Sequence, residues 1–328
     1  MKIWKIALLA LCAASVAAPA AAMIDRVGTA GALFLKVGMN VRSVGMGEAS
    51  TALSADAASA FSNPAGLAGL TQRQAVVSDA EWLADIRFVG GAYAFPYGSN
   101  GTAAISVISV DYGDIPMVRE QDADVIAGTF SPRDLALGVS YGHRWTDRLA
   151  VGGSLKYIDQ SIAEYHARGM AFDFGTIYHT GFKSLRLAML TNNFGPDMSF
   201  DGSYVDRYYI GTAYVEQSRL FGGYDLPLNF RIGVAYDFDL SETSRLTAAV
   251  DGTHPNDYSE RVHFGAEYSW DQMIFLRGGY VTNAEEQSYS AGCGFNLKTS
   301  MGSAKIDYAY SDFGVFKGVH RFGLSMSF

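Results

Sequence analysis

The sequence has few cysteines and few prolines, and beyond its first residues it has no long apolar run. It contains two cysteines, Cys12 and Cys293, and 8 prolines. We expect Cys12 to be lost with a leader peptide, so a disulfide framework is excluded. After residue 22 there is no run of 18 or more apolar residues, which excludes a helical membrane protein.

An excess of basic residues is also missing. The chain has 25 Lys and Arg against 33 Asp and Glu, and its net charge is −8. Loss of Lys2 and Lys5 with the leader, which contains no acidic residue, lowers the net charge to −10. An acidic chain without a basic cluster is not expected to bind nucleic acid.

Catalytic motifs are equally scarce. The sequence contains no HExxH motif, and its histidines are scattered without the spacing of metal ligands. Alternation places Cys293 on an apolar face, where a thiol behaves as a small hydrophobic group. We therefore predict no enzyme, no cofactor and no metal site.

The first 22 residues resemble a secretory signal peptide. Lys2 and Lys5 form a positive start, residues 6–16 an apolar core, and Ala20-Ala21-Ala22 a cleavage site. An uncleaved anchor helix would need about 20 apolar residues. A lipoprotein signal at Cys12 would need a small residue where Leu11 stands. We predict cleavage before Met23 and export.

Glycine and aromatic residues are abundant, and they occur in segments that alternate with a period of two. In the last ten residues, bulky side chains from His320 to Phe328 alternate with small or polar ones. This pattern is typical of a strand with one apolar face and one polar face. In an exported chain it indicates an outer-membrane β-barrel, with the apolar face toward lipid.

We predict fourteen strands, each long enough to cross a bilayer when tilted. Short turns alternate with longer connections, as in bacterial barrels, and an even count places the C-terminus in the periplasm beside the N-terminus. The predicted spans are 72–82, 86–97, 101–112, 134–145, 148–160, 168–181, 183–194, 226–239, 244–254, 260–270, 272–283, 287–298, 301–312 and 317–328.

Two long connections, 113–133 and 195–225, are predicted to lie outside the cell. Residues 204–216 also fit a strand, but one added strand would make the count odd, so we predict a loop. The loop is rich in aromatic side chains, which could dock a partner protein or cover the barrel mouth. The candidate docking residues are Phe200, Tyr204, Tyr208, Tyr209, Phe221 and Tyr224.

Residues 28–70 differ from the rest of the chain, because small residues dominate and residues 52–61 have helical spacing. We predict an all-β transmembrane barrel (72–328) with a partly helical N-terminal hatch (23–71) in its lumen. Charged residues of both signs should face the lumen and bind the hatch. They are Arg144, Lys156, Asp173, Arg231, Asp237, Asp251, Glu267, Arg277, Lys305, Asp307 and Arg321.

Four N-terminal motifs, in this order, resemble the PorV/PorQ family, a branch of the FadL-like barrels. They are residues 31–38 (GALFLKVG), 42–49 (RSVGMGEA), 63–67 (NPAGL) and 81–86 (EWLADI), and the similarity extends to the C-terminus. It implies an N-terminal hatch and a role in transport across the outer membrane. PorV-like barrels receive proteins from the type IX secretion translocon, whereas FadL-like barrels carry long-chain fatty acids and other hydrophobic small molecules.

The family's hatch motif is matched by Asn63, Pro64, Ala65 and Gly66, which we interpret as a rigid turn that ends the preceding helix, with Gly66 permitting positive φ. Paired glycines in Gly45-Met46-Gly47 would let the hatch approach the wall. Phe328 resembles the terminal signal read by the outer-membrane assembly machinery. The alternative interpretation of Phe328 is an ordinary aromatic residue that faces the lipid.

We therefore predict a non-enzymatic outer-membrane component that handles secreted proteins of a type IX-like system. The alternative is a channel for hydrophobic small molecules, and a structural barrel without cargo is a third possibility.

Overall fold

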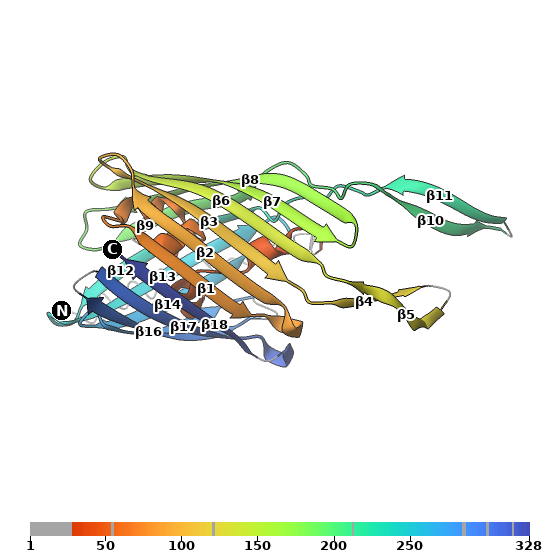
Figure 1. The fold of residues 1–328 in the computed structure, drawn as a ribbon. Coiled ribbons are helices and arrows are strands. Elements are labelled where there is room, and N and C mark those ends of the chain that lie inside the picture. Colours follow the sequence, from red (N-terminus) through yellow and green to blue (C-terminus); the bar gives the residue numbers. More distant parts are fainter. Residues whose placement is uncertain are drawn as a thin grey trace.

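In the computed structural model, fourteen antiparallel strands form a closed barrel (Figure 1). The structure describes residues 28–53, 56–119, 122–211, 213–283, 287–299, 302–316 and 318–328, so the predicted signal peptide lies outside the described residues. Strand β1 pairs with β18 and closes the ring. The barrel strands are β1 (Gln74–Glu81), β2 (Arg87–Pro96), β3 (Gly101–Asp111), β6 (Arg133–Arg144), β7 (Leu149–Ile162), β8 (Tyr165–His179), β9 (Arg186–Phe194), β12 (Asn229–Asp239), β13 (Ser244–Pro255), β14 (Arg261–Trp270), β15 (Ile274–Val281), β16 (Tyr289–Thr299), β17 (Gly302–Asp312) and β18 (Gly318–Ser327).

The predicted fourteen-stranded barrel is confirmed, because each predicted span overlaps one of these strands. Short turns, such as 145–148 and 271–273, lie at one end, which we call the periplasmic end. The long connections 112–132 and 195–228 lie at the other end, which we call the outer end.

Side chains alternate between the two faces of the wall. Large apolar residues such as Ile105, Phe174 and Leu324 are exposed on the outside of the ring, whereas their sequence neighbours point inward. Cys293, which pairs with Leu276 and Tyr308, lies on this exposed face. No helix among the described residues is long and apolar enough to cross a membrane.

The two long outer connections each contain a β-hairpin that projects beyond the ring (Figure 1). We call them arm A, which consists of β4 (Ile115–Arg119) and β5 (Asp122–Phe130), and arm B, which consists of β10 (Ser203–Ile210) and β11 (Ala213–Leu220). The prediction of a loop over residues 204–216 was therefore wrong, because β10 and β11 cover most of this range. The two strands of each arm pair with each other instead of with the wall, so they do not change the count of fourteen barrel strands.

Residues 28–70, the N-terminal segment, run inside the ring (Figure 1). The described residues of the segment form four short helices: η1 (Leu33–Lys36), α2 (Val41–Gly45), η2 (Ala57–Ala60) and η3 (Pro64–Gly69). Helix α2 contacts β15 to β18, while η3 contacts β6 to β8 on the opposite side. Buried apolar side chains from the segment and the wall, such as Phe34, Met46 and Leu67, form the core.

The segment enters the barrel from an unexpected end. Gly31 and Lys36 contact Asp225 and Asp257 in connections at the outer end, and the chain then runs to the periplasmic end before β1 begins. The first described residues therefore do not lie beside the C-terminus. Strand parity specifies where β1 starts, but it does not specify the path of the chain before β1.

Phe328 lies at the periplasmic end, where its backbone N–H donates to the Arg73 carbonyl at 3.0 Å and its ring stacks on Tyr93. Phe328 is 55% exposed. We expect deletion of Phe328 to reduce assembled protein several-fold, because the last residue holds β18 beside β1 and is the expected assembly signal. The measurement is the amount of heat-modifiable barrel in outer-membrane fractions. Full assembly of the truncated chain would contradict this role.

Candidate functional site

The N-terminal segment approaches the wall closely at a row of three glycines. Gly142 pairs with Gly152, and Gly152 pairs with Gly175, so the three lie side by side on β6, β7 and β8. A Cβ atom at Gly142 would lie 2.6 Å from the Pro64 carbonyl oxygen. At Gly152 a Cβ would overlap the backbone nitrogen of Ala65. We call this row the first glycine seat.

The hatch motif occupies the first glycine seat. Asn63, which is 1% exposed, donates through Nδ2 to the Thr51 carbonyl at 2.8 Å and accepts through Oδ1 from the Ala65 N–H at 3.1 Å. Pro64 is the first residue of η3, where its missing N–H costs no hydrogen bond. The hatch motif therefore begins helix η3. The prediction that it ends the preceding helix was wrong. Gly66 does not have a positive φ, so that part of the expectation was wrong too.

A second glycine seat lies across the lumen, where Gly45-Met46-Gly47 meets β14, β15 and β16. Gly265 and Gly279 form a direct pair there. A Cβ at Gly265 would lie 2.5 Å from the Met46 carbonyl oxygen, and one at Gly279 would overlap the Gly47 nitrogen. Gly47 has a φ of +64°, which favours glycine. The paired glycines permit direct backbone contact with the wall.

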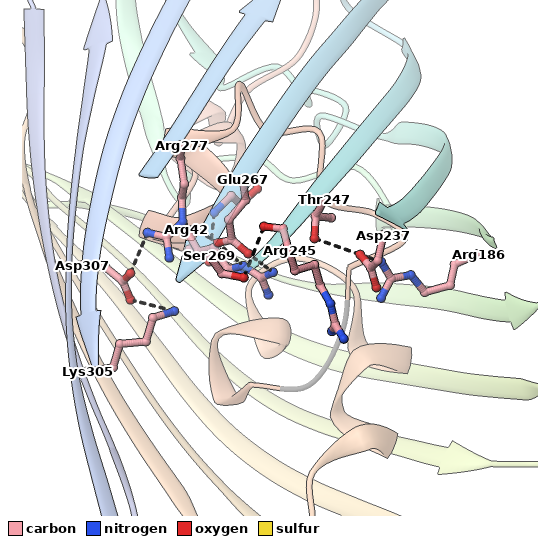
Figure 2. Close-up of polar contacts among 12 residues, drawn as sticks. Arg42, Arg186, Asp237, Arg245, Thr247, Glu267, Ser269, Arg277, Lys305 and Asp307 are labelled. Atoms are coloured by element: carbon pink, nitrogen blue, oxygen red, sulfur yellow. Dashed lines mark hydrogen bonds and ion pairs between the residues drawn. The ribbon is translucent and has the colours of Figure 1, made fainter. Parts of the chain in front are cut away.

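Beside the second seat, a network of charged side chains joins the segment to three strands (Figure 2). Arg42 of α2 contacts Glu267 through two hydrogen bonds, at 2.9 and 2.6 Å. Arg277 donates to Glu267 at 2.6 Å and to Asp307 at 2.6 Å, and Lys305 lies 3.4 Å from Asp307. Glu267 and Arg277 are buried. Such charges are stable only when they are paired.

Other tethers connect the segment to the remaining wall. Asp251 accepts through Oδ2 from the backbone N–H groups of Ser50 and Thr51, both at 2.9 Å, and from the Thr51 hydroxyl at 2.6 Å. His263 Nδ1 lies 2.8 Å from the Gly47 carbonyl oxygen. These contacts come from β13 and β14, so the segment is held on several sides.

All the charged residues predicted to face the lumen make contacts inside the ring. Some bind the segment directly, as Arg144 does at the Ala68 carbonyl. Others pair within the wall, as Lys156 does with Asp173, and Arg186 with Asp237 (Figure 2). Sequence reasoning missed Arg42 and Arg186. For Arg42 the signal was available, because a cation in a segment of mainly small and apolar residues requires a partner.

A cavity of about 250 Å³ remains between the segment and the wall, toward the periplasmic end. Met39, Val76 and Phe275 form apolar parts of its lining, and Arg42 and Lys305 add charge. Among the described residues no group of three or more His, Cys, Asp or Glu side chains is arranged to hold a metal.

The aromatic residues of connection 195–228 divide into two groups. Phe200, Phe221 and Tyr224 pack over the barrel mouth, with ring centroids of Phe200 and Phe221 6.2 Å apart. Tyr224 donates to Gln160 at 2.8 Å. Burial, together with the nearby Asp134, raises the pKa of Tyr224 to about 12, so its hydroxyl remains a donor at neutral pH.

The remaining candidates belong to arm B. Tyr204 is 41% exposed and contacts Phe221, and Tyr208 donates to Gln217 at 3.2 Å. Tyr209 lies in β10, but its side chain is outside the described part of the chain. Tyr204 thus joins arm B to the aromatic group at the barrel mouth through Phe221, and the docking role of the six residues stays a prediction.

Residues 20–254 match the family model described as type IX secretion system protein PorV. The chain belongs to the PorV family. The resemblance in the N-terminal motifs is thus confirmed. No curated protein matches the chain.

Solved structures with a similar fold are outer-membrane barrels of the FadL type. The Ralstonia pickettii toluene transporter TbuX matches with a TM-score of 0.56 and 14% identity over 88% of this chain and 97% of that one. The Pseudomonas putida toluene transporter TodX matches with a TM-score of 0.56 and 12% identity over 88% of this chain and 96% of that one. A Pseudomonas aeruginosa FadL homologue matches with a TM-score of 0.51 and 12% identity over 88% of this chain and 98% of that one. At these identities the likeness shows the fold alone.

We expect Gly152→Ala to displace the N-terminal segment, because the added Cβ would overlap backbone atoms of the hatch motif. Overpacking of this kind costs about 1–3 kcal/mol. The measurement is sensitivity to large antibiotics in cells with normal levels of assembled barrel, which should rise several-fold. Gly153→Ala is the matched control, because the nearest atom to its Cβ would be 3.5 Å away. Equal sensitivity of the two variants would contradict the role of the first seat.

We also expect Glu267→Gln to destabilise the barrel, because Arg42 and Arg277 would lose their shared carboxylate. Removing one partner of a buried charge pair costs roughly 3–5 kcal/mol. The temperature at which the purified barrel loses its heat-modifiable form should fall by several degrees. The control is Glu260→Gln, which breaks an exposed contact with His254 and should leave this temperature nearly unchanged. A network without structural importance would give the same result for both variants.

Proposed function

We propose that this PorV-family barrel is a docking component for secreted proteins, which bind to arms A and B. The observation that carries the proposal is the projection of two hairpins from the same end of the barrel (Figure 1). An isolated two-stranded hairpin is marginally stable in water, and its edges have free backbone donors and acceptors. A protein partner that covers the arms would supply both contact area and hydrogen bonds.

The exposed side chains of the arms support protein binding. In arm A, Val118 is 56% exposed and Ile126 is 64% exposed. In arm B, Val205 and Tyr214 are each 53% exposed, and Leu220 is 80% exposed. Aromatic and apolar groups that are surrounded by polar residues are typical of protein interfaces.

We further propose that the N-terminal segment is a hatch that keeps the lumen closed. Two glycine seats, the Arg42 to Glu267 contact and the Asp251 tether support this role. A closed lumen suits a barrel that works through its outer surface. Family membership is consistent with a non-enzymatic role in secretion and with partners in the type IX system.

A channel for hydrophobic small molecules is the second candidate. The cavity of about 250 Å³, which has Met39, Val76 and Phe275 in its lining, favours it. The fold is also that of proteins described as toluene transporters. In this case a ligand would need to pass the hatch, and the arms would be dispensable.

The arms provide the test. Residues 113–132 would be replaced by a two-residue turn, and in a second variant residues 203–220 by a short Gly-Ser linker that retains Phe221 and Tyr224. Each tagged barrel is purified in mild detergent from its native membrane, and the proteins and lipids that co-purify are identified by mass spectrometry. We expect secreted proteins and translocon components to be lost at least tenfold from one or both arm variants.

A third variant, Val315→Ser with Phe316→Ser, is the control, because these exposed side chains lie in the separate outer connection between β17 and β18. It should retain the partners. Undiminished recovery of these proteins from both arm variants would contradict the docking role. Fatty acids or similar molecules as the sole companions of the intact barrel would favour the channel.

A further inference from the structure

The bases of the two arms are joined by a chain of hydrogen bonds between side chains. At the base of arm A, the Tyr112 hydroxyl donates to Asp134 Oδ2 at 2.6 Å. Gln160 Nε2 donates to Asp134 Oδ1 at 3.1 Å, and the Tyr224 hydroxyl, at the base of arm B, donates to Gln160 Oε1 at 2.8 Å. We call these four residues the base chain. It connects arm A to arm B through β6 and β7.

The base chain favours one arrangement of the two arms. Asp134 is 6% exposed, and Tyr112 and Tyr224 pack against the same apolar cluster, which contains Met198. A buried polar group that loses its partner costs more free energy than an exposed one. Arm B is also closed at its base, where Met198 and Tyr224 exchange backbone hydrogen bonds at 3.0 and 2.8 Å. The points at which the arms leave the barrel are therefore fixed relative to each other.

The two arms are close enough for one protein to contact both. Four wall strands, β6 to β9, separate them, and neighbouring strands lie about 4.8 Å apart, which gives roughly 20 Å along the wall. A small folded domain is about 30 Å across. Both arms project in the same direction, with the β7–β8 turn between them (Figure 1). A single domain can therefore lie on this turn and reach both arms.

The surface between the arms is acidic at its base and apolar above. The connecting residues at the base contain neither Lys nor Arg, and they are 112–118, 128–132, 163–164, 195–202 and 221–228. Their acidic residues are all exposed, and they are Asp114, Glu164, Asp197, Asp201 and Asp225. Higher up, Val205, Tyr214 and Leu220 are exposed on one face of arm B. This surface is complementary to a protein with a basic side toward the barrel and apolar groups toward the arms.

We propose that the arms form one clamp, in which the base chain holds them at a fixed separation for a single folded protein with a basic side. Asp134 and Gln160 are positioning residues in this clamp, because they act through the arms. The inference rests on the docking role proposed above, and it adds that both arms bind the same molecule. Two linked contacts raise affinity by roughly 10²–10⁴ over one contact, so neither arm is sufficient alone.

The two arm deletions distinguish the clamp from simpler docking, because both leave the base chain intact. Each deletion should lower the recovery of partner proteins about tenfold or more, since the linked contact is lost. Loss of partners from only one deletion would overturn the clamp and leave the docking role standing. Undiminished recovery from both deletions would overturn the clamp and the docking role together.

The base chain itself is tested by Gln160→Met, which retains the size of the side chain and removes its hydrogen bonds to Asp134 and Tyr224. Partner recovery should fall about tenfold at equal amounts of assembled barrel, because the arms are unchanged but no longer held at a fixed separation. Asp159→Asn is the matched control on the same strand, because it removes only exposed contacts such as that with Arg168. It should leave partner recovery unchanged. Undiminished recovery with Gln160→Met would overturn the clamp.

The separation of the arm bases is measured without any partner. Nitroxide labels at Ile115→Cys and Gly222→Cys, in a background with Cys12→Ser and Cys293→Ser, report this distance by electron paramagnetic resonance. We expect one narrow distance distribution when Gln160 is present and a broad one with Gln160→Met. A broad distribution in both proteins, or the same narrow one, would overturn the clamp.

The charge of the partner is tested with the unaltered protein. Recovery of partners should fall several-fold in about 1 M NaCl, where the screening length is about 3 Å. Recovery that does not depend on salt would contradict a partner with a basic side.

Discussion

Direct contact between two backbones is the constraint on which the interior of this barrel depends. A β-strand normally presents a side chain at every second position, so another chain cannot approach its backbone closely. The wall removes this barrier at Gly142, Gly152 and Gly175 on one side and at Gly265 and Gly279 on the other. The N-terminal segment can therefore be short and rich in small residues, and it still contacts opposite walls.

The charged groups of the interior follow from the same arrangement. Once the glycine seats place α2 against β15 to β18, Arg42 lies beside Glu267, and Arg277 and Asp307 complete a network that neutralises these buried charges (Figure 2). Removing the segment would leave Glu267 without one of its two arginines and Asp251 without its donors. The segment thus supplies partners to buried charges of the wall, whereas the two arms project beyond the ring (Figure 1).

The barrel itself could be predicted from the sequence, because a period of two is visible in every spanning strand and short turns alternate with longer connections. Arm A could not, since residues 113–133 show little alternation. In arm B residues 204–216 do fit a strand, but strand parity says nothing of hairpins outside the ring. The glycine seats depend on strand register: Gly142, Gly152 and Gly175 become neighbours only when β6, β7 and β8 pair. The motif around Asn63 was recognisable, but its partners on the wall were not.

The most direct test of a closed lumen is the conductance of the purified barrel in a planar lipid bilayer at low voltage. If the N-terminal segment closes the lumen, the intact protein should show no steady current, and a variant that lacks residues 28–70 should open large, stable channels. A steady open-pore conductance of the intact protein would contradict the closure, because it would require a continuous aqueous path past both glycine seats.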